Sequence, residues 1–167
     1  MLCTGVQLLA VNPAPLTLRS SIRTNASPDK SCNLLVSICL TCISSSELLN
    51  SAQYLVPSVR SVLAQHYRNI ELICVDDNSS DETKQVLEHL SISDNRIMVL
   101  SNPNRGVAMA RNCGIEHASG RYIAFLDSDD VWHKDKLKIQ ITLMKKNNWE
   151  ISHTSYKIID RNNIIIN

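Results

Sequence analysis

The chain has 167 residues, a net charge of +1 and 4% aromatic residues. This length favours a single domain with its own core. The near-neutral charge and the scarcity of aromatic residues argue against a nucleic-acid-binding surface. No apolar run approaches the roughly 20 residues that a membrane-spanning helix needs. Residues 1–31 are rich in Ser, Thr, Ala and Pro and show no periodicity. We expect them to form a disordered leader or to precede the true start, and a transit peptide is the alternative.

Residues 32–167 alternate between predicted strands and predicted helices. Short apolar runs with β-branched residues predict buried strands, at residues 34–40, 70–75, 96–100, 121–126 and 151–159. Apolar side chains at helical spacing predict helices after each of the first four strands. The third of these helices, residues 107–118, is built largely from small residues and is expected to lie close to its neighbour.

Local signals predict where these helices begin and end. Pro57 is expected in the first turn of the first helix, where its missing N–H costs little. Ser79 and Glu82 have the spacing of a capping box for the second helix. Gly120 is expected to end the third helix in a left-handed conformation.

The β-α-β-α order predicts an α/β fold, with a doubly wound, mainly parallel sheet and helices on both faces. The chain ends on a run of isoleucines at residues 164–166. An apolar strand at the terminus suggests that the domain is incomplete at its C-terminus. Ligands of such sheets bind beyond the carboxyl ends of the strands.

Polar residues follow three of the predicted strands at that edge. Asp127, Asp129 and Asp130 end one strand, Asp76 and Asp77 end another, and Thr41 ends a third. Close carboxylates repel one another unless a cation or hydrogen-bond donors compensate them. Magnesium-like cations are held by one or two carboxylates together with substrate phosphates. The pattern therefore predicts a metal and phosphate site, and helix capping is the alternative explanation.

Six cysteines occur in the chain, most of them inside apolar runs. Cys39 and Cys42 form a C-x-x-C pair, but no second pair of ligands has the spacing of a zinc site. We interpret the cysteines as buried or loop thiols, which favours a reducing, cytoplasmic compartment.

Several motifs resemble the family 2 glycosyltransferases, which have the Rossmann-like GT-A fold. They are VSICLT at residues 36–41, SVRSVLAQ at 58–65, VDDNSSDET at 75–83, NRGVAMARNCGI at 104–115 and FLDSDD at 125–130. The resemblance covers most of the chain, and the motifs follow one another in the order and at the spacing of the family.

The resemblance implies a nucleotide-diphosphate sugar donor, most simply a UDP-sugar. Asp127 and Asp129 would form the D-x-D pair, with Mn²⁺ or Mg²⁺ bridging Asp129 and the diphosphate. Asp77 would bind the base, and Arg105 a phosphate. By this resemblance the nucleotide-sugar-binding residues are Thr41, Asp76, Asp77, Arg105 and Asp127.

The complete enzyme would transfer the sugar to a glycan, lipid or protein hydroxyl with inversion, as in polysaccharide biosynthesis. It would act in the cytoplasm or at the surface of the cytoplasmic membrane. The family usually has Tyr-Asn after its first strand, where this chain has Ile43 and Ser44. No general base is identified, because little chain follows the D-x-D motif and His153 is more simply a structural histidine.

Three alternatives remain open at this point. A truncated, non-catalytic nucleotide-binding remnant would keep the motifs without the reaction. Asp127 to Val131 also matches the D-x-D-x-[TV] motif of haloacid-dehalogenase-like phosphatases. A receiver domain likewise gathers acids at strand ends, although it gives no reason for the motif at residues 104–115.

Overall fold

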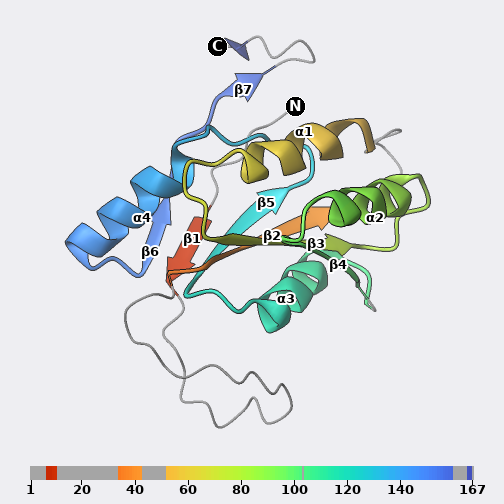
Figure 1. Cartoon of the computed structure of the whole chain (residues 1–167), viewed down its shortest axis with the longest axis horizontal. Coiled ribbons are helices and arrows are strands. Elements are labelled where there is room, and N and C mark those ends of the chain that lie inside the picture. The colour runs from red at the N-terminus through yellow and green to blue at the C-terminus, as the bar shows by residue number, and fades with distance from the viewer. Residues whose placement is uncertain (1–6, 11–33, 43–51, 103, 160–164, 167) are drawn as a thin grey trace, which may run out of the picture.

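The computed structural model describes residues 7–10, 34–42, 52–102, 104–159 and 165–166 (Figure 1). The strands are β1 (Gln7–Ala10), β2 (Val36–Cys42), β3 (Ile70–Asp76), β4 (Ile97–Ser101), β5 (Tyr122–Asp127), β6 (Ile151–His153), β7 (Ile158–Ile159) and β8 (Ile165–Ile166). The helices are α1 (Ala52–Leu63), α2 (Thr83–Ser93), α3 (Val107–His117) and α4 (Lys136–Asn147). No helix in the described part of the chain is long and apolar enough to cross a bilayer.

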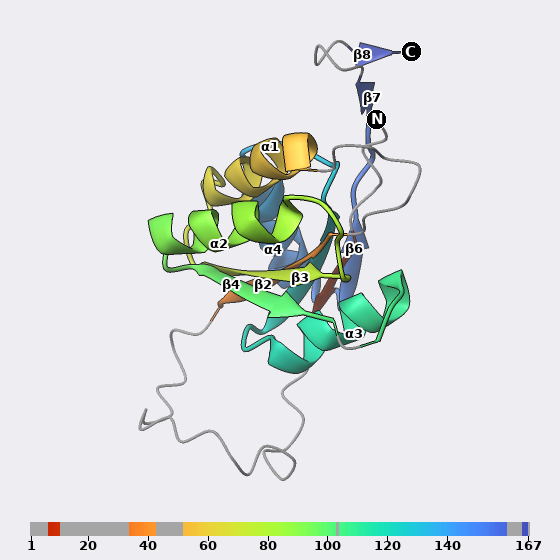
Figure 2. The ribbon, with the colours of Figure 1, turned by 90° about the vertical axis from the view of Figure 1, so that its right-hand side faces the viewer.

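The central sheet has the strand order β4-β3-β2-β5-β1-β6. Strands β2 to β5 are parallel neighbours, and β1 pairs antiparallel with both β5 and β6. Figure 2 shows α1, α2 and α4 on one face of this sheet and α3 on the other. The predicted α/β class, with a mainly parallel sheet covered on both faces, is confirmed.

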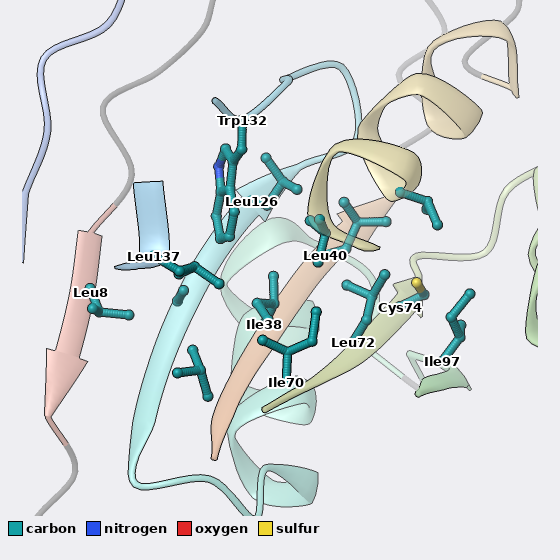
Figure 3. Close-up of a cluster of buried hydrophobic side chains, with 14 of the residues drawn as sticks. Leu8, Ile38, Leu40, Ile70, Leu72, Cys74, Ile97, Leu126, Trp132 and Leu137 are labelled. Carbon is teal, nitrogen blue, oxygen red and sulfur yellow. The ribbon is translucent and has the colours of Figure 1, made fainter. Parts of the chain in front are cut away.

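Two apolar layers hold the helices against the sheet. On the first face, buried leucines of α1, α2 and α4 pack over Ile38, Leu40 and Leu72, as Figure 3 shows for part of the cluster. On the other face, Ala110 of α3 packs against a smaller cluster that includes Cys39. A methyl group added at Gly114 would lie 2.9 Å from the Cys39 sulfur. The small residues of α3 therefore do allow the close approach that the sequence predicts.

The thiols of β2 and β3 belong to these layers. Cys39 and Cys42 are buried and free, as is Cys74. Burial raises the pKa of the Cys39 and Cys74 thiols to about 12, and raises that of Cys42 as well. These thiols stay protonated at neutral pH and act as small apolar groups.

The structure has a strand within the segment that was expected to be a leader. Strand β1 lies between β5 and β6, and the Leu8 side chain is fully buried in the first apolar layer. The expectation that all of residues 1–31 lie outside the fold is therefore wrong for residues 7–10. The remaining residues of 1–31 lie outside the described parts, as do Ile43 and Ser44.

Three local predictions about helix ends are also wrong. Helix α1 begins at Ala52, so Pro57 lies inside it rather than in its first turn. The N-cap residue of α2 is Glu82 rather than Ser79, and the Glu82 side chain makes no capping hydrogen bond. Instead, Asp81 Oδ1 accepts a hydrogen bond from the Thr83 N–H at 3.0 Å.

Gly120 is required for space rather than for a left-handed turn. Among the described glycines, the one with positive φ is Gly106, at 118°. A methyl group at Gly120 would lie 2.6 Å from the Leu35 carbonyl oxygen. The predicted fifth strand is likewise divided, because β6 ends at His153 and β7 pairs with β8 in a separate sheet.

Candidate functional site

The carboxyl ends of β2, β3 and β5 meet at one edge of the sheet. The strand register places Thr41 opposite Asp127 and Cys42 opposite Asp76. The apolar, buried residues of these strands fix the register, because a shift of one residue would turn the apolar side chains of one layer to the other face. The sheet therefore brings the predicted polar strand ends together, as the strand order requires.

Asp127 is held at this edge by two hydrogen bonds to the same carboxylate oxygen. Thr41 Oγ1 donates to Asp127 Oδ1 at 3.1 Å, and Arg111 Nη2 donates to it at 3.0 Å. The side chains of Arg111 and Asp127 are 40% and 29% exposed, so the ion pair remains open to solvent.

Arg111 is a site residue that the sequence reasoning did not single out. It lies in α3, and its guanidinium carbon is 6.0 Å from the centre of the Phe125 ring. Its Nε is buried without a hydrogen-bond partner among the described residues. Its place in the motif at residues 104–115 was the available signal, but the pairing with Asp127 depends on how α3 crosses the sheet.

Asp129 and Asp130 continue from Asp127 into a tight turn. The Asp130 N–H donates to the Asp127 carbonyl oxygen at 3.0 Å, and Asp130 is buried. Burial raises the pKa of the Asp129 carboxyl, and the negative charge of Asp127 raises it further. A group whose pKa is raised in this way is stabilised as a carboxylate when a cation binds beside it.

Helix α1 and the residues just after it hold the segment that follows these acids. The buried Gln65 side chain donates from Nε2 to the His133 carbonyl oxygen at 2.7 Å and accepts from the Leu137 N–H at 3.1 Å. Ser61 Oγ accepts from the Trp132 N–H at 3.0 Å. Both residues belong to the motif at residues 58–65, so part of that motif positions the segment immediately after the acidic turn.

Asp77 organises the entrance to α3. Its two carboxylate oxygens accept from the Gly106 N–H at 3.0 and 2.9 Å, and Oδ1 also accepts from Asn102 Nδ2 at 2.7 Å. The positive φ of Gly106 directs this N–H toward the carboxylate. Asp77 remains partly exposed, and a carboxylate has further acceptor positions for a ligand.

Asp76 and Arg105 differ in their surroundings. Asp76 is 4% exposed, and its Oδ1 accepts from the Ser79 N–H at 3.1 Å. This carboxylate therefore stabilises the turn after β3, and it does not cap α2, which begins at Thr83. Arg105 is exposed immediately before Gly106. His153 lies exposed at the end of β6, in register with Gln7.

The residues at the carboxyl ends of β2, β3 and β5 could hold a cation only if a ligand supplied further coordinating oxygens. Among the described residues, no group of three or more His, Cys, Asp or Glu side chains comes together as a metal site. Asp127 and Asp129 supply carboxylate oxygens, which suit Mg²⁺ or Mn²⁺ when phosphate oxygens complete the coordination. This donor set fits the D-x-D role but not a metal held by protein alone.

Curated relatives match the chain over about two thirds of its length. It is 46% identical over 117 residues to the UDP-Glc:alpha-D-GlcNAc-diphosphoundecaprenol beta-1,3-glucosyltransferase WfgD of Escherichia coli, covering 70% of this chain and 46% of that protein. It is 43% identical over 111 residues to the putative teichuronic acid biosynthesis glycosyltransferase TuaG of Bacillus subtilis, covering 66% and 44%. The matched region thus spans less than half the length of these relatives.

Solved structures and a family profile agree with these relatives. The fold resembles TarS residues 1–349 of S. aureus in complex with UDP, with a TM-score of 0.58 and 26% identity over 68% of this chain and 32% of that one. The glycosyl transferase family 2 profile matches residues 48–164. This match decides against the phosphatase and receiver alternatives. The chain belongs to glycosyltransferase family 2.

Proposed function

We propose that this chain is the nucleotide-sugar-binding part of a glycosyltransferase that holds a UDP-linked sugar through Mn²⁺ or Mg²⁺. The observation that carries the proposal is the arrangement around Asp127. Its carboxylate is oriented by Thr41 and Arg111 and lies two residues from the half-buried Asp129. Carboxylates and a guanidinium at one strand edge can receive both the cation and the phosphates of a nucleoside diphosphate.

The residues divide between the two ends of the donor. Asp127 and Asp129 face the diphosphate and the cation, with Arg111 and Arg105 as nearby positive charges for phosphate oxygens. Asp77 follows β3, which β2 separates from β5, and it accepts a hydrogen bond from the base, while Thr41 on β2 lines the space between. Asp76 supports this arrangement through its bond to the Ser79 N–H.

The reaction is the transfer of a sugar from the diphosphate to an acceptor hydroxyl, with inversion at the anomeric carbon. The bound cation supplies stabilisation of the charge that develops on the leaving diphosphate. Arg111 keeps Asp127 in position during this step. We assign the general base for the acceptor hydroxyl to the part of the relatives that this chain does not share.

The relatives suggest the class of donor and acceptor. The name of the E. coli relative specifies UDP-Glc, a diphosphoundecaprenol-linked acceptor and a β-1,3 linkage. We propose a UDP-hexose donor and a lipid-linked saccharide acceptor for the complete enzyme. Such an acceptor would require the enzyme to work at the cytoplasmic face of the membrane.

Calorimetric titration of UDP with and without Mn²⁺ tests the donor site. We expect Mn²⁺ to increase the UDP affinity at least about tenfold, since it adds charge-assisted contacts to the diphosphate. Asp129→Asn should remove most of this increase. Glu150→Gln, which removes an exposed acid outside the site, serves as the matched control and should bind as the native chain does.

UDP affinity that is identical in Mn²⁺ and in EDTA would overturn the metal role. Binding of UDP by the native chain without detectable sugar transfer would support the proposal that this chain holds the donor and that the general base lies in the part of the relatives that it does not share. Transfer by this chain alone would show that the base lies within it. A complete enzyme that binds donor and acceptor but transfers nothing would favour the non-catalytic alternative.

A further inference from the structure

The outer face of α4 carries an unusual mixture of exposed lysines and large apolar side chains. Helix α4 lies at the periphery of the molecule, beside β6 (Figure 1). We define the α4 surface by its exposed residues, which are Lys138, Ile139, Leu143, Lys145, Lys146 and Trp149. None of them is required for the core, which α4 contacts through Leu137, Ile141 and Met144.

The positive charges of the α4 surface have no acidic residue within the helix itself, and the nearest acids in the sequence are Asp135 before it and the exposed Glu150 after it. Within the described part of the chain, Lys138, Lys145 and Lys146 form no ion pair. The whole chain has a net charge of only +1, so this helix is a local concentration of charge rather than a sample of a basic protein.

The α4 surface carries three exposed apolar side chains. Ile139, Leu143 and Trp149 are 54%, 42% and 49% exposed. Ile139 and Leu143 are four residues apart and share one side of the helix. Asn148, with φ of 54°, ends the helix, and the Trp149 N–H donates to the Met144 carbonyl at 2.9 Å. Trp149 is thereby kept next to the last turn.

Exposed lysines next to exposed aliphatic and tryptophan side chains are the residue types that contact anionic membrane surfaces. Helices in a membrane interface place tryptophan and aliphatic side chains among the acyl chains and lysines among the anionic headgroups. We propose that the α4 surface docks the protein on an anionic phospholipid bilayer. A protein partner would need acidic residues placed opposite each of the three lysines. An anionic membrane provides negative headgroups across the whole face. The proposal goes beyond donor binding and needs neither UDP nor metal.

Vesicle co-sedimentation of the full chain, without nucleotide or metal, tests the proposal. We expect binding to vesicles with equal parts of phosphatidylglycerol and phosphatidylcholine, and little binding to phosphatidylcholine alone. Raising the ionic strength should weaken the binding, because it screens exposed charges. Each lysine near an anionic surface contributes a factor of about five. The combined change Lys138→Gln, Lys145→Gln and Lys146→Gln should therefore weaken binding roughly a hundredfold.

The apolar part of the surface is tested separately. The combined change Ile139→Ser and Leu143→Ser should also weaken binding to the anionic vesicles. Circular dichroism should show the same helix content as in the native chain. Matched controls lie on α2, where Lys84→Gln and Ile92→Ser remove an exposed lysine and an exposed isoleucine. These controls should bind as the native chain does. The fluorescence of Trp149 should shift to the blue on binding, and Trp149→Phe should remove the shift.

Several results would overturn the proposal. Equal binding to neutral and anionic vesicles would exclude the headgroup contacts, and unchanged binding of the lysine variant would exclude this surface. A dimer in analytical ultracentrifugation that disappears with Ile139→Ser and Leu143→Ser would assign the surface to a second copy of the chain instead. Trp149 fluorescence that does not change with anionic vesicles would reject the proposal without any variant.

Discussion

Arg111 donates a hydrogen bond from Nη2 to Oδ1 of Asp127 at 3.0 Å, joining α3 to the end of β5. This pair links Asp127, the acid proposed to face the diphosphate, to α3. That helix lies on the face of the sheet opposite to α1, α2 and α4. A guanidinium fixes a carboxylate more firmly than an ammonium does, because its planar donors hold a defined geometry.

We therefore expect Arg111→Met to weaken Mn²⁺-dependent UDP binding about tenfold, with a stability loss of at most about 1 kcal/mol for this exposed pair. Arg111→Lys should restore only part of the affinity, since it keeps the charge but not the fork geometry. Calorimetry at constant Mn²⁺ measures both variants. Affinity equal to that of the native chain in Arg111→Met would show that the pair does not support the site.

Leu8 is predicted to stabilise the sheet from the N-terminal segment. Its strand, β1, lies between β5 and β6, and its side chain is fully buried. Leu8→Ala should lower the free energy of unfolding by about 2–4 kcal/mol, the usual loss for a buried leucine. Ile92→Ala, at a side chain that is 84% exposed, is the control and should change stability by less than about 0.5 kcal/mol. Urea unfolding of both variants measures the difference, and a Leu8→Ala chain as stable as the control would show that β1 adds little to the sheet.

Gly114 and Cys39 are predicted to be energetically coupled. A methyl group at Gly114 would lie 2.9 Å from the Cys39 sulfur and 3.0 Å from its Cβ. Gly114→Ala should cost about 1–3 kcal/mol through overpacking. Adding Cys39→Ala removes the sulfur, so the double variant should be about 1 kcal/mol more stable than the sum of the single changes predicts.

Gly120→Ala is the matched comparison for this cycle. Its added methyl group would lie 2.6–2.7 Å from Leu35 O, Ser37 Oγ and Ser37 N, and the two backbone atoms cannot rotate away. Cys39→Ala should therefore give it no relief. Strict additivity in the Gly114 cycle would contradict the close packing of α3 on β2.

Lys136 is predicted to make stability rise in alkaline solution. Burial lowers the pKa of its ammonium from 10.5 to about 8, although Nζ donates to Gln140 Oε1 and Thr154 Oγ1. Between these two pH values the unfolded chain binds more protons than the folded one, so the contribution of this group to stability increases with pH. The increase approaches about 3 kcal/mol once the pH exceeds both pKa values.

Lys136→Met isolates this effect, because it keeps an unbranched side chain without the charge. The difference in unfolding free energy between the native chain and Lys136→Met should shift in favour of the native chain from pH 7 to pH 10. Urea titrations under reducing conditions measure the shift. A difference that does not depend on pH would mean that Lys136 keeps an ordinary pKa in the folded protein.

The acids at the strand ends were predictable because the alternation of strands and helices along the chain and the chemistry of the side chains can both be read from the local sequence. An apolar run that stops at Asp127 marks a strand end, and parallel strands place their ends at one edge. The partners of these acids were not predictable in the same way. Arg111 reaches Asp127 only through the crossing of α3, and Gln65 reaches the acidic turn only through the packing of α1.

Strand β1 and Gly120 show a different limit. Residues 7–10 belong to a segment without periodicity, and their strand pairs with β5 and β6, which lie far away in the sequence. Gly120 follows a helix, which suggested that it ends the helix in a left-handed conformation. A glycine is needed there because Leu35 and Ser37, on another segment, leave no room for a side chain. In both cases tertiary contacts decide what the local sequence leaves open.

Helix α3 is fastened at two points to two different acidic strand ends. Asp77, after β3, holds the N–H of Gly106 at the start of the helix, and Asp127, at the end of β5, holds Arg111 one turn further along. A helix behaves as a rigid rod over this distance. The position of this one helix therefore sets the surroundings of both carboxylates, so a substitution that displaces α3 would alter the hydrogen bonds of Asp77 and of Asp127 together.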